Sequence, residues 1–568
     1  MLHLIPSVRT LSETGGHLPK NAIYYNSEAL DERLVKVLSK LPFNKGGTPV
    51  SVTLKGDVGE GYTLDVSTDE IRICADGPAG AFYALQTLRQ IFANGTPIPC
   101  LHIEDEPDFA YRGFYHDVTR GKVPTVATLK RLIDQMAYYK LNSLQLYVEH
   151  TFEFKETEDV KDSFGYLTGV ELEELDAYCK ENFIDFIPSL ATFGHMYEIL
   201  QQPQYQHLRV LEDFTPSSNF LGERMRHHTI DPTKQGSIEL VQSLIDQFAP
   251  HFTSEYFNLC GDETFDLKHH PKAEGDHGQM YVEFVDRIIR YLKDKNKKVM
   301  MWADILLKHP ETIEQLPEDT VFLNWDYSPN ATQDATAKIA ALGRPQIVCP
   351  GTWSWDSLSE LTDVEEKNIS KMIDYGKKHG ALGVLNTNWG DYGNPCSIEL
   401  AEYGMVFGAA KSWSADTEAN DAFHRAADRL LYRKDGAFDL LSALNDCYDH
   451  LKWKHFVTDH YKISDGVAAD RKATEEDCRY VIGVCKKLLA DLKTPWGNDE
   501  YRQELILAAT GFWVMAEITA SRAGYPITPT ADAARWLRDY SDAWRSKNKE
   551  SELRTIIKLF SAPTEEKL

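Results

Sequence analysis

A strand followed by a helix recurs eight times between about residues 110 and 415, and few folds accommodate such an alternation. Eight units in about 300 residues are typical of an α/β TIM barrel, in which eight parallel strands close into a ring surrounded by helices. A doubly wound open sheet also alternates, but it does not predict polar and aromatic residues just after nearly every strand. The candidate strands are Gly113–Val118, Ser143–Val148, Ile184–Leu190, Tyr256–Leu259, Val299–Trp302, Val321–Trp325, Gln346–Cys349 and Leu382–Asn386.

Two further regions flank the predicted barrel. Before it, short alternating strands and one helix with an apolar face predict a small α+β domain. After it, segments with an apolar stripe at helical spacing predict a bundle of helices packed on the barrel. We therefore expect an α+β domain over 1–105, a barrel over 106–415 and a C-terminal helical domain over 416–568. The alternating strands of the first region are Val50–Leu54, Tyr62–Val66 and Glu70–Cys74.

The charge balance and the cysteines exclude several classes of protein. The chain has 568 residues, with 61 Lys and Arg against 86 Asp and Glu, so its formal net charge is −25. Proteins that bind nucleic acids use clusters of Lys and Arg against the phosphates, whereas acidic residues predominate in this chain. We therefore expect no nucleic-acid partner. The 9 cysteines are scattered without a CxxC pair, so neither a zinc ribbon nor a disulfide framework is predicted, and no cofactor is expected.

The start of the chain, MLHLIPSVRTLSETGG, lacks the basic residues and apolar core of a signal peptide. No run of about 18 apolar residues occurs, so no membrane insertion is expected. Both observations predict a cytoplasmic protein, and the scattered cysteines agree with reduced thiols there.

Carboxylates, aromatic rings and an arginine follow the predicted strands, at the edge where a TIM barrel places its active site. Such a set is typical of a sugar site, because indole rings stack on the C–H faces of a sugar while charged groups bind its hydroxyls. Five of the 11 tryptophans occur at these positions, which strengthens the interpretation. In chain order the residues are Asp117, Arg120, Glu149, His150, His195, Asp262, Glu263, Trp302, Asp304, Trp325, Tyr327, Trp353, Trp355, Asp356, Trp389, Asp391 and Tyr392.

Asp262 and Glu263 are adjacent in an apolar segment, FNLCGDETF, after the fourth strand. Neighbouring carboxylates repel each other, so we expect the pKa of one of them to rise, which suits a general acid. In an ordinary glycosidase the two carboxyl groups flank the scissile bond and lie about 5–10 Å apart. Adjacent side chains do not easily flank a sugar in this way, and one of the two is therefore expected to have another role.

Several segments, taken in order, resemble glycoside hydrolase family 20, the β-N-acetylhexosaminidases. YRGFYHDVTRGKVP followed by LIDQMAYYKLNSLQLYVEH is similar to the first two strands of the family's barrel and the helix between them. FGHM resembles the third-strand histidine motif, NLCGDET the catalytic Asp-Glu motif and NWGDYG the eighth-strand Trp-Gly-Glu motif. EGYTLDVSTDEIRICADGPAGAFYALQTLRQI looks like the domain that precedes the barrel. The resemblance covers most of the first 415 residues.

The resemblance implies an exo-acting β-N-acetylhexosaminidase, which removes terminal β-linked GlcNAc or GalNAc from a glycan or glycoconjugate. Catalysis would be substrate-assisted and retaining: the acetamido oxygen of the substrate attacks C1 and forms an oxazolinium ion. Glu263 is implied to protonate the leaving oxygen and then to activate water. Asp262 is implied to orient the acetamido N–H and to stabilise the positive charge that develops there.

The resemblance also implies which residues bind the sugar. Arg120 lies 29 residues before Glu149, which matches the family's sugar-binding arginine and the acidic residue after strand two. Arg120 and Asp391 are implied to hold ring hydroxyls, and His195 corresponds to the third-strand histidine. The acetamido pocket and the ring face are implied to be walled by Trp302, Trp325 and Trp389.

Three positions depart from the family pattern. Asp391 stands where Glu is usual, and Glu149-His150 stand where an Asp-Asp pair is common. The seventh strand, GTWSWD, lacks the tyrosine whose hydroxyl holds the acetamido carbonyl. The side chains left open for this role are Trp353, Tyr327 and Tyr392.

Three other functions remain as alternatives. A metal-dependent hydrolase would use histidines at strand ends, but His227-His228, His269-His270 and His277 lie in loop stretches and no HxH or HExxH occurs, so no metal site is expected. A non-catalytic sugar-binding protein on the same fold would lack the Asp-Glu pair, which is present. An enzyme that releases a disaccharide, like a lacto-N-biosidase, would differ in the depth of its pocket.

Overall fold

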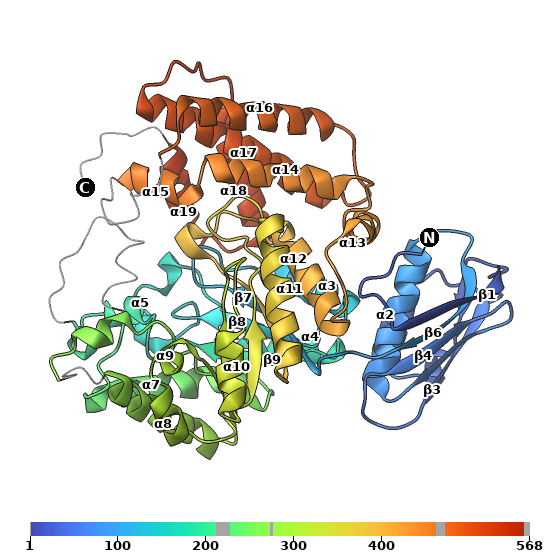
Figure 1. Cartoon of the computed structure of the whole chain (residues 1–568), viewed down its shortest axis with the longest axis horizontal. Coiled ribbons are helices and arrows are strands. Elements are labelled where there is room, and N and C mark those ends of the chain that lie inside the picture. Colours follow the sequence, from blue (N-terminus) through green and yellow to red (C-terminus); the bar gives the residue numbers. More distant parts are fainter. Residues whose placement is uncertain (1, 212–227, 273–276, 462–471, 562–568) are drawn as a thin grey trace.

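The computed structural model describes residues 2–211, 228–272, 277–461 and 472–561. Figure 1 shows three parts in the predicted order: a sheet domain (blue), a central barrel (cyan to yellow) and a group of C-terminal helices (orange and red). The sheet domain forms one end of the molecule, and the C-terminal helices lie along one side of the barrel. The predicted fold class is therefore confirmed.

The N-terminal domain is a six-stranded sheet, and helix α2 (Pro78–Ala93) packs between this sheet and the barrel (Figure 1). Proline suits the first turn of α2, because the N–H that it lacks has no partner there. Strand β1 was not predicted, since all its residues are exposed and it has no apolar alternation. In sheet order the strands are β1 (Thr10–His17), β6 (Pro99–Asp105), β4 (Tyr62–Val66), β5 (Ile71–Ala75), β3 (Thr48–Leu54) and β2 (Ile23–Tyr24).

Eight parallel strands close into the barrel, and each of them lies within two residues of a predicted strand. The last strand pairs with the first in register from Gly383 opposite Tyr111 to Asn388 opposite His116. This pairing puts the carboxyl ends of the first and last strands side by side. The strands are β7 (Tyr111–Asp117), β8 (Ser143–Val148), β9 (Asp185–Leu190), β10 (Tyr256–Asn258), β11 (Lys298–Trp302), β12 (Val321–Trp325), β13 (Gln346–Cys349) and β14 (Gly383–Asn388).

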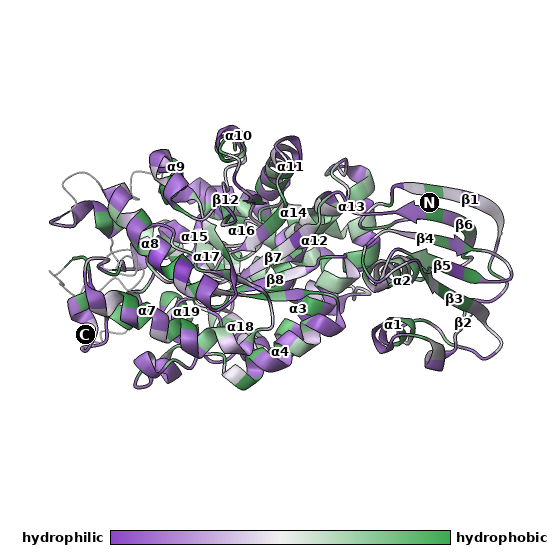
Figure 2. Cartoon of the chain, turned by 90° about the horizontal axis from the view of Figure 1, so that it is seen from below, coloured by the Kyte–Doolittle hydropathy of each residue, from purple (hydrophilic) through white to green (hydrophobic). Residues whose placement is uncertain are grey.

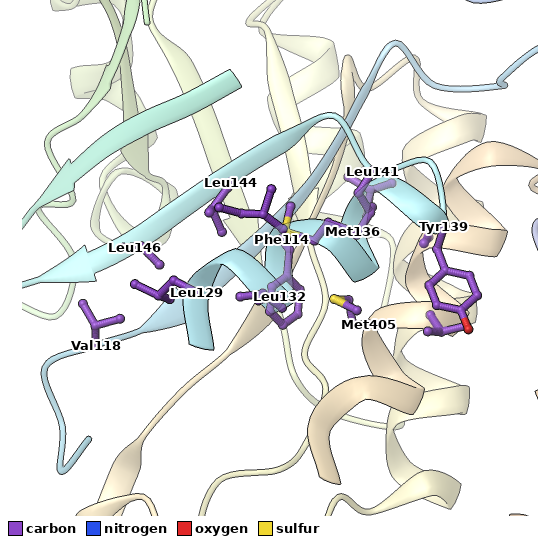
Figure 3. Packing of buried hydrophobic residues seen from close by; sticks show 14 of the residues in the cluster. Phe114, Val118, Leu129, Leu132, Met136, Tyr139, Leu141, Leu144, Leu146 and Met405 are labelled. Carbon is purple, nitrogen blue, oxygen red and sulfur yellow. The ribbon is translucent and has the colours of Figure 1, made fainter. Parts of the chain in front are cut away.

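The first barrel helix shows how the wall is held together. The hydroxyl of Thr125 caps the helix by accepting the N–H of Thr128. Leu129, Leu132 and Met136 lie on one face of the helix and pack toward the strands β7 and β8 (Figure 3). Each such buried side chain contributes about 1.5–3 kcal/mol to folding.

The other barrel helices repeat this arrangement. Figure 2 shows largely hydrophobic strands β7 and β8 inside the barrel, and many hydrophilic residues on the outer helices such as α8 and α10. The barrel helices are α3 (Val126–Tyr138), α4 (Gly169–Glu181), α5 (Tyr197–Leu200), α7 (Gln235–Phe248), α8 (His277–Asp294), α9 (Asp304–Lys308), α10 (Asp334–Ala341), α11 (Thr362–Lys378) and α12 (Glu402–Trp413).

The C-terminal region is helical, as predicted, but it contains two short helices that the apolar stripes did not indicate, α15 and α19. Both are 8 or 9 residues long, too short for a clear periodicity. The helices are α13 (Asp421–Ala427), α14 (Ala437–His450), α15 (Trp453–Tyr461), α16 (Glu475–Asp491), α17 (Asp499–Ala523), α18 (Ala533–Lys547) and α19 (Leu553–Phe560).

Helix α17 is the central helix of this region. Among the described residues it alone has the length and mean hydropathy (1.2) that a membrane span needs, and 61% of its apolar window is buried inside the protein. Helix α16 packs along it, and α18 packs against it as well. Burial of this extent is typical of the core helix of a bundle, so length and composition alone are weak support for a span.

Candidate active site

The ends of five barrel strands bring six of the predicted charged residues into one network. They come from loops that are far apart in the sequence, after β7, β8, β9, β10 and β14. Ion-pair contacts of 3.3 to 3.9 Å link all six side chains into a continuous group. The residues are Arg120, Glu149, His195, Asp262, Glu263 and Asp391.

His195 lies at the centre of this network. Its Nε2 is 3.4 Å from Asp262 Oδ2 and 3.3 Å from Glu263 Oε2. Its Nδ1 faces Arg120 Nη2 at 3.4 Å and Glu149 Oε1 at 3.9 Å. Burial lowers the pKa of His195, but the carboxylates of Asp262 and Glu263 outweigh burial and raise this pKa to about 10. A pKa above neutral pH favours the positively charged, doubly protonated imidazole.

Local backbone geometry explains why His195 reaches the acidic pair. A side chain at Gly194 would clash with the carbonyl oxygen of Asp262, so only glycine lets these two loops approach each other. The backbone N–H of His195 donates to Nδ1 of the buried His228 at 2.8 Å. Gly194 and His195 therefore hold the loop after the third strand against the loop after the fourth strand, which carries Asp262.

Asp304, at the end of β11, is a third carboxyl beside the acidic pair. Its Oδ2 accepts the backbone N–H of Glu263 at 3.3 Å. Burial, followed by the negative charge of Asp262, raises the pKa of Asp304 to about 7. Glu263 itself has a left-handed backbone (φ 50°), and the hydrogen bond from its N–H to Asp304 helps to hold that strained turn.

Arg120 is the cation of the network. Its Nη1 lies 3.4 Å from Asp117 and 3.7 Å from Asp391, and its Nε lies 3.6 Å from Glu149. Burial disfavours the charge, but Asp391 and the other acids raise the pKa of Arg120. The guanidinium stays protonated and lies over the rings of two aromatic residues, at 5.1 Å from Tyr147 and 5.2 Å from Trp389.

The loops that carry Arg120 and Asp391 touch through glycines. A Cβ atom at Gly390 would lie 2.5 Å from the carbonyl oxygen of Arg120. A Cβ atom at Gly121 would clash with the carbonyl oxygen of Gly393, and Gly121 also has a φ of +90°. The close approach of the two loops therefore requires glycine, and it sets the distance between Arg120 and Asp391.

We expect Gly121→Ala to lower the free energy of unfolding by about 2–4 kcal/mol, since it adds a backbone clash to the cost of a positive φ. It should also reduce kcat/KM, because the clash moves Arg120. Urea unfolding and steady-state kinetics measure both effects. Gly380→Ala is the matched control: Gly380 has a φ of +67° but nothing lies within 4 Å of its added Cβ. A full loss of stability in the control as well would contradict the role of the close approach.

Six of the seven predicted aromatic residues, all except Tyr392, belong to one cluster at the same end of the barrel. Trp325 stacks on Tyr327, with 5.1 Å between ring centroids, and Trp302 lies 5.9 Å from Trp389. Trp353 donates its indole N–H to the carbonyl oxygen of Tyr327 at 2.6 Å. The indole of Trp389 donates to the hydroxyl of Tyr327 at 2.8 Å.

These contacts separate the three side chains left open for the acetamido carbonyl. The indole N–H of Trp353 already has a backbone partner, so it is not available. The ring of Tyr392 lies beneath Lys454, on the side of Asp391. The hydroxyl of Tyr327 accepts from the indole of Trp389. Burial is the main cause that raises the pKa of Tyr327, so this hydroxyl stays protonated, and the charge of Asp262 makes a smaller contribution in the same direction. Tyr327 is the side chain best placed for this role.

Strained backbone accumulates around this site. Left-handed φ values at residues other than glycine are uncommon, and they persist where the surrounding structure imposes them. Several such residues follow the third, fourth, seventh and eighth barrel strands: His195, Cys260, Glu263, Trp353, Asp356 and Tyr392.

Tyr147 has a clear role in the network but was not among the predicted site residues, while Asp117 and Asp304 were predicted at strand ends without an assigned role. Asp117 accepts the N–H groups of Thr119 and Arg120, and its second oxygen accepts that of Gly390. Tyr147 donates its hydroxyl to Glu149 at 2.9 Å. Asp117 ends the strand β7, and Tyr147 lies within β8, one residue before its end. Tyr147 was missed because only residues after the predicted strands were considered.

Among the described residues, one group of three side chains has the spacing of a metal site: His195, Asp262 and Glu263, with ligand atoms within 4.8 Å of one another. Because the pKa of His195 is raised beside these two carboxylates, a metal ion at this site would have to displace a proton from the imidazole. The histidines considered for a metal-dependent hydrolase form no second group with metal-ligand spacing among the described residues. His270 Nε2 lies 3.2 Å from Asp231 and His277 lies 3.1 Å from His309, while His227 is outside the described residues.

Two family models match the chain. The model described as glycosyl hydrolase family 20, catalytic domain, matches residues 109–431. The model described as glycosyl hydrolase family 20, domain 2, matches residues 4–106. Together they account for the N-terminal sheet domain, the barrel and the start of the C-terminal helices.

Curated relatives carry related descriptions. A β-N-acetylhexosaminidase of Cellulomonas fimi is 25% identical over 435 residues, which cover 68% of this chain and 82% of the relative. A β-hexosaminidase of Vibrio vulnificus is 26% identical over 301 residues, or 43% of this chain and 35% of the relative. The share of each relative that the chain spans thus varies widely.

Solved structures share the fold. A chitobiase of Flavobacterium johnsoniae superposes with a TM-score of 0.62 at 18% identity, over 99% of both chains. An N-acetyl-β-hexosaminidase of Streptomyces plicatus superposes with a TM-score of 0.59 at 19% identity, over 75% of this chain and 94% of that chain. The first of these alignments includes the C-terminal helices, so their arrangement recurs in a solved protein.

Proposed function

The chain belongs to glycosyl hydrolase family 20 and is a glycoside hydrolase; from this premise we propose that it is an exo-acting β-N-acetylhexosaminidase. It removes a terminal, non-reducing β-linked GlcNAc or GalNAc from a glycan or glycoconjugate. The reaction retains the anomeric configuration and passes through an oxazolinium ion that the substrate's own acetamido group forms.

One observation carries this proposal: the carboxylates of Asp262 and Glu263 both contact the same nitrogen, His195 Nε2, at 3.4 and 3.3 Å. They stand side by side and do not face each other across a space for a sugar ring. Of the nearby acids, Glu149 and Asp391 are paired with Arg120. An internal nucleophile on the substrate supplies what a second facing carboxylate would otherwise provide.

Exposure divides the roles within the acidic pair. The side chain of Glu263 is 28% exposed, so it can meet a leaving group and later a water molecule. The side chain of Asp262 is 10% exposed, and its buried Oδ1 has no hydrogen-bond partner in the described part of the chain. An unpartnered buried carboxylate oxygen is costly, and an acetamido N–H of the substrate would satisfy it.

The steps follow from these positions. The acetamido oxygen attacks C1 while the bond from C1 to the leaving oxygen breaks, and Glu263 gives its proton to that oxygen. Asp262 accepts the acetamido N–H and offsets the positive charge of the oxazolinium ring. Water then attacks C1 from the face that the leaving group vacated, and Glu263 takes a proton from this water. The bond between C1 and the acetamido oxygen breaks in this step, which restores the acetamido group. Two displacements at C1 leave the configuration retained.

Tyr327 positions the acetamido group in this proposal. Its hydroxyl donates to the carbonyl oxygen that becomes the nucleophile, while Trp389 holds the hydroxyl in place. The family resemblance implies that a tyrosine of the seventh strand holds the acetamido carbonyl. In this chain the proposed tyrosine comes from the loop after the sixth strand, β12. Tyr327 and Asp262 thus hold the two ends of one amide.

We expect Tyr327→Phe to lower kcat/KM for a nitrophenyl N-acetylglucosaminide about 10- to 100-fold, because the nucleophilic oxygen loses its orientation. Tyr291→Phe is the matched control, since Tyr291 donates to Asp246 on the outer surface. Steady-state kinetics of both variants measure the difference. Equal activity of the two variants would remove Tyr327 from the acetamido pocket.

Arg120 and Asp391 bind ring hydroxyls in this proposal. They lie 3.7 Å apart at the closing seam of the barrel, on the opposite side of His195 from the acidic pair. GlcNAc and GalNAc differ only in the configuration at C4. The relative rates on the two sugars therefore report on this part of the site.

The direct test is hydrolysis of nitrophenyl β-GlcNAc, β-GalNAc and β-glucose, with and without EDTA. We expect cleavage of both acetamido sugars, no cleavage of the glucoside and no effect of EDTA. Loss of activity in EDTA would favour a metal at His195, Asp262 and Glu263. No cleavage of any monosaccharide substrate would shift the assignment to release of a disaccharide or to sugar binding alone.

A further inference from the structure

The C-terminal helical region contacts both loops that carry the proposed hydroxyl-binding residues. One loop follows β7 and carries Arg120, and the other follows β14 and carries Asp391. Neither the family motifs nor the apolar stripes of this region assign it a role. Its contacts with the two loops include direct hydrogen bonds.

The loop after β7 runs beside the segment between α18 and α19. The backbone N–H of Glu552 donates to the carbonyl oxygen of Gly121 at 3.1 Å, directly after Arg120. The N–H of Lys549 donates to Val123 at 2.8 Å, and Pro124 pairs with Asn548 in an isolated β-bridge. Because these are backbone contacts, they hold the path of the loop and thereby the base of Arg120.

The loop after β14 is held by α15, α18 and α19. The indole N–H of Trp453, on α15, donates to the carbonyl oxygen of Tyr392 at 3.0 Å. The hydroxyl of Tyr540, on α18, donates to the carbonyl oxygen of Pro395 at 2.8 Å. Ile556, on α19, lies 3.4 Å from where a Cβ atom of Gly393 would be. Asp391, next to Tyr392, is therefore fixed from outside the barrel.

Lys454, beside Trp453 on α15, adds a charge to this wall. Its Nζ lies 5.3 Å above the ring of Tyr392. It is close enough to Asp356, at the end of the seventh strand, to counter part of the rise in the pKa of that carboxyl, which burial and then Asp391 cause. One Asp356 oxygen is buried and has no hydrogen-bond partner among the described residues. A polar wall of Asp356, Asp391, Tyr392 and Lys454 therefore lies between the barrel and α15.

We infer that helix α15 of the C-terminal region is a working part of the sugar site. Trp453 positions the loop that carries Asp391, and Lys454 closes the wall on the hydroxyl side of the terminal sugar. This inference rests on the proposed function, since it assigns the wall to the part of the ring around C4. The partner of the wall is a terminal N-acetylhexosamine with free hydroxyl groups, because buried carboxylate oxygens gain hydrogen bonds from hydroxyls.

The wall has two consequences for specificity. A change in the position of Asp391 relative to Arg120 affects the binding of the two C4 epimers, GlcNAc and GalNAc, unequally. The ratio of their rates of hydrolysis therefore depends on α15. A wall on this side is also expected to block a further sugar at the non-reducing end, which is the requirement for exo action. Neither consequence involves Asp262, Glu263 or Tyr327, which bind at the acetamido side.

The first test is Trp453→Phe, which keeps an aromatic ring but removes the donor to Tyr392. Trp513→Phe is the matched control, because the indole of Trp513 donates to Glu517 one turn away on α17. We expect Trp453→Phe to change the GlcNAc to GalNAc ratio of kcat/KM about 3- to 10-fold, mainly through KM, since one hydrogen bond is lost. The control should keep the wild-type ratio.

The second test is Lys454→Met, which stays informative if the buried Trp453 does not tolerate replacement. Lys487→Met, at an exposed position of α16, is its control. Lys454→Met should raise KM for both sugars by unequal factors, and Lys454→Arg should restore much of the wild-type ratio. An unchanged ratio in folded Lys454→Met and Trp453→Phe would overturn the inference.

Two further measurements separate this inference from the proposed function. Binding of free GlcNAc and GalNAc, measured by titration calorimetry, does not depend on turnover and should weaken unequally in the α15 variants. The dependence of rate on fluorination of the N-acyl group should stay that of the wild type, because the acetamido side is untouched. If the wild type binds both sugars but cleaves neither, the proposed function fails while the inference is still decided by binding.

Discussion

Glu263→Gln is expected to lower kcat/KM by about 10³-fold on a substrate with a sugar leaving group, such as an N-acetylglucosamine disaccharide. This loss corresponds to about 4 kcal/mol of transition-state stabilisation. The amide of glutamine keeps the size of the side chain and its contact with His195, but it has no proton to give to the leaving oxygen. The loss is measured by steady-state kinetics with the disaccharide.

The same variant provides its own control through the leaving group. Dinitrophenolate departs without protonation, so kcat/KM of Glu263→Gln on a dinitrophenyl N-acetylglucosaminide should be much closer to that of the wild type. Glu255→Gln, which removes an exposed carboxylate paired with Lys298, should change neither substrate. A loss of equal size on both substrates would show that Glu263 is not the acid for the leaving oxygen.

Asp262→Asn is expected to lower kcat about 10²- to 10³-fold and to raise KM much less. The charge of Asp262 opposes a positive charge that exists only once the oxazolinium ring begins to form, and an interaction made in the transition state acts on kcat. Asparagine also presents an N–H group to the acetamido N–H in one of its two orientations. Steady-state kinetics with nitrophenyl N-acetylglucosaminide measure both parameters.

Asp319→Asn is the control for this substitution, because Asp319 is 65% exposed and paired with Lys293 on the outer surface. The melting temperature of both variants should be compared with that of the wild type, since Asp262 is buried beside His195. An effect of Asp262→Asn on KM alone would mean that the carboxylate binds the ground state and does not stabilise the oxazolinium ion.

The barrel was predictable from sequence because each strand is a short apolar run with strong boundaries. Val321–Trp325 and Gln346–Cys349 end at the predicted residues, since a polar or proline residue follows at once. The exposed strand β1 was not predictable, because it is held by backbone pairing with β6 and buries no side chain that would mark it. An alternating apolar pattern marks a strand only when one of its faces is buried, and all side chains of β1 are exposed.

The sequence was sufficient to predict most of the residues that form the candidate site, but not which of them contact one another. Strand ends pointed to Asp262, Glu263 and His195 because parallel strands bring their carboxyl ends together. The choice among three acetamido partners could not be made from sequence, because no pattern shows that the indole N–H of Trp353 donates to the backbone of Tyr327. The contribution of Trp453 was beyond the sequence, because no periodicity relates a nine-residue helix to a loop 61 positions earlier.

Substrate-assisted catalysis at Asp262 and Glu263 is the central claim, and one measurement tests it most directly. Nitrophenyl glucosaminides with N-acetyl, N-fluoroacetyl, N-difluoroacetyl and N-trifluoroacetyl groups differ in how strongly the carbonyl oxygen attacks C1. The account predicts that kcat/KM falls steeply with each fluorine, because the nucleophile weakens while the leaving group stays the same. Equal kcat/KM across the series would contradict the account, since the acetamido group would then take no part in the reaction.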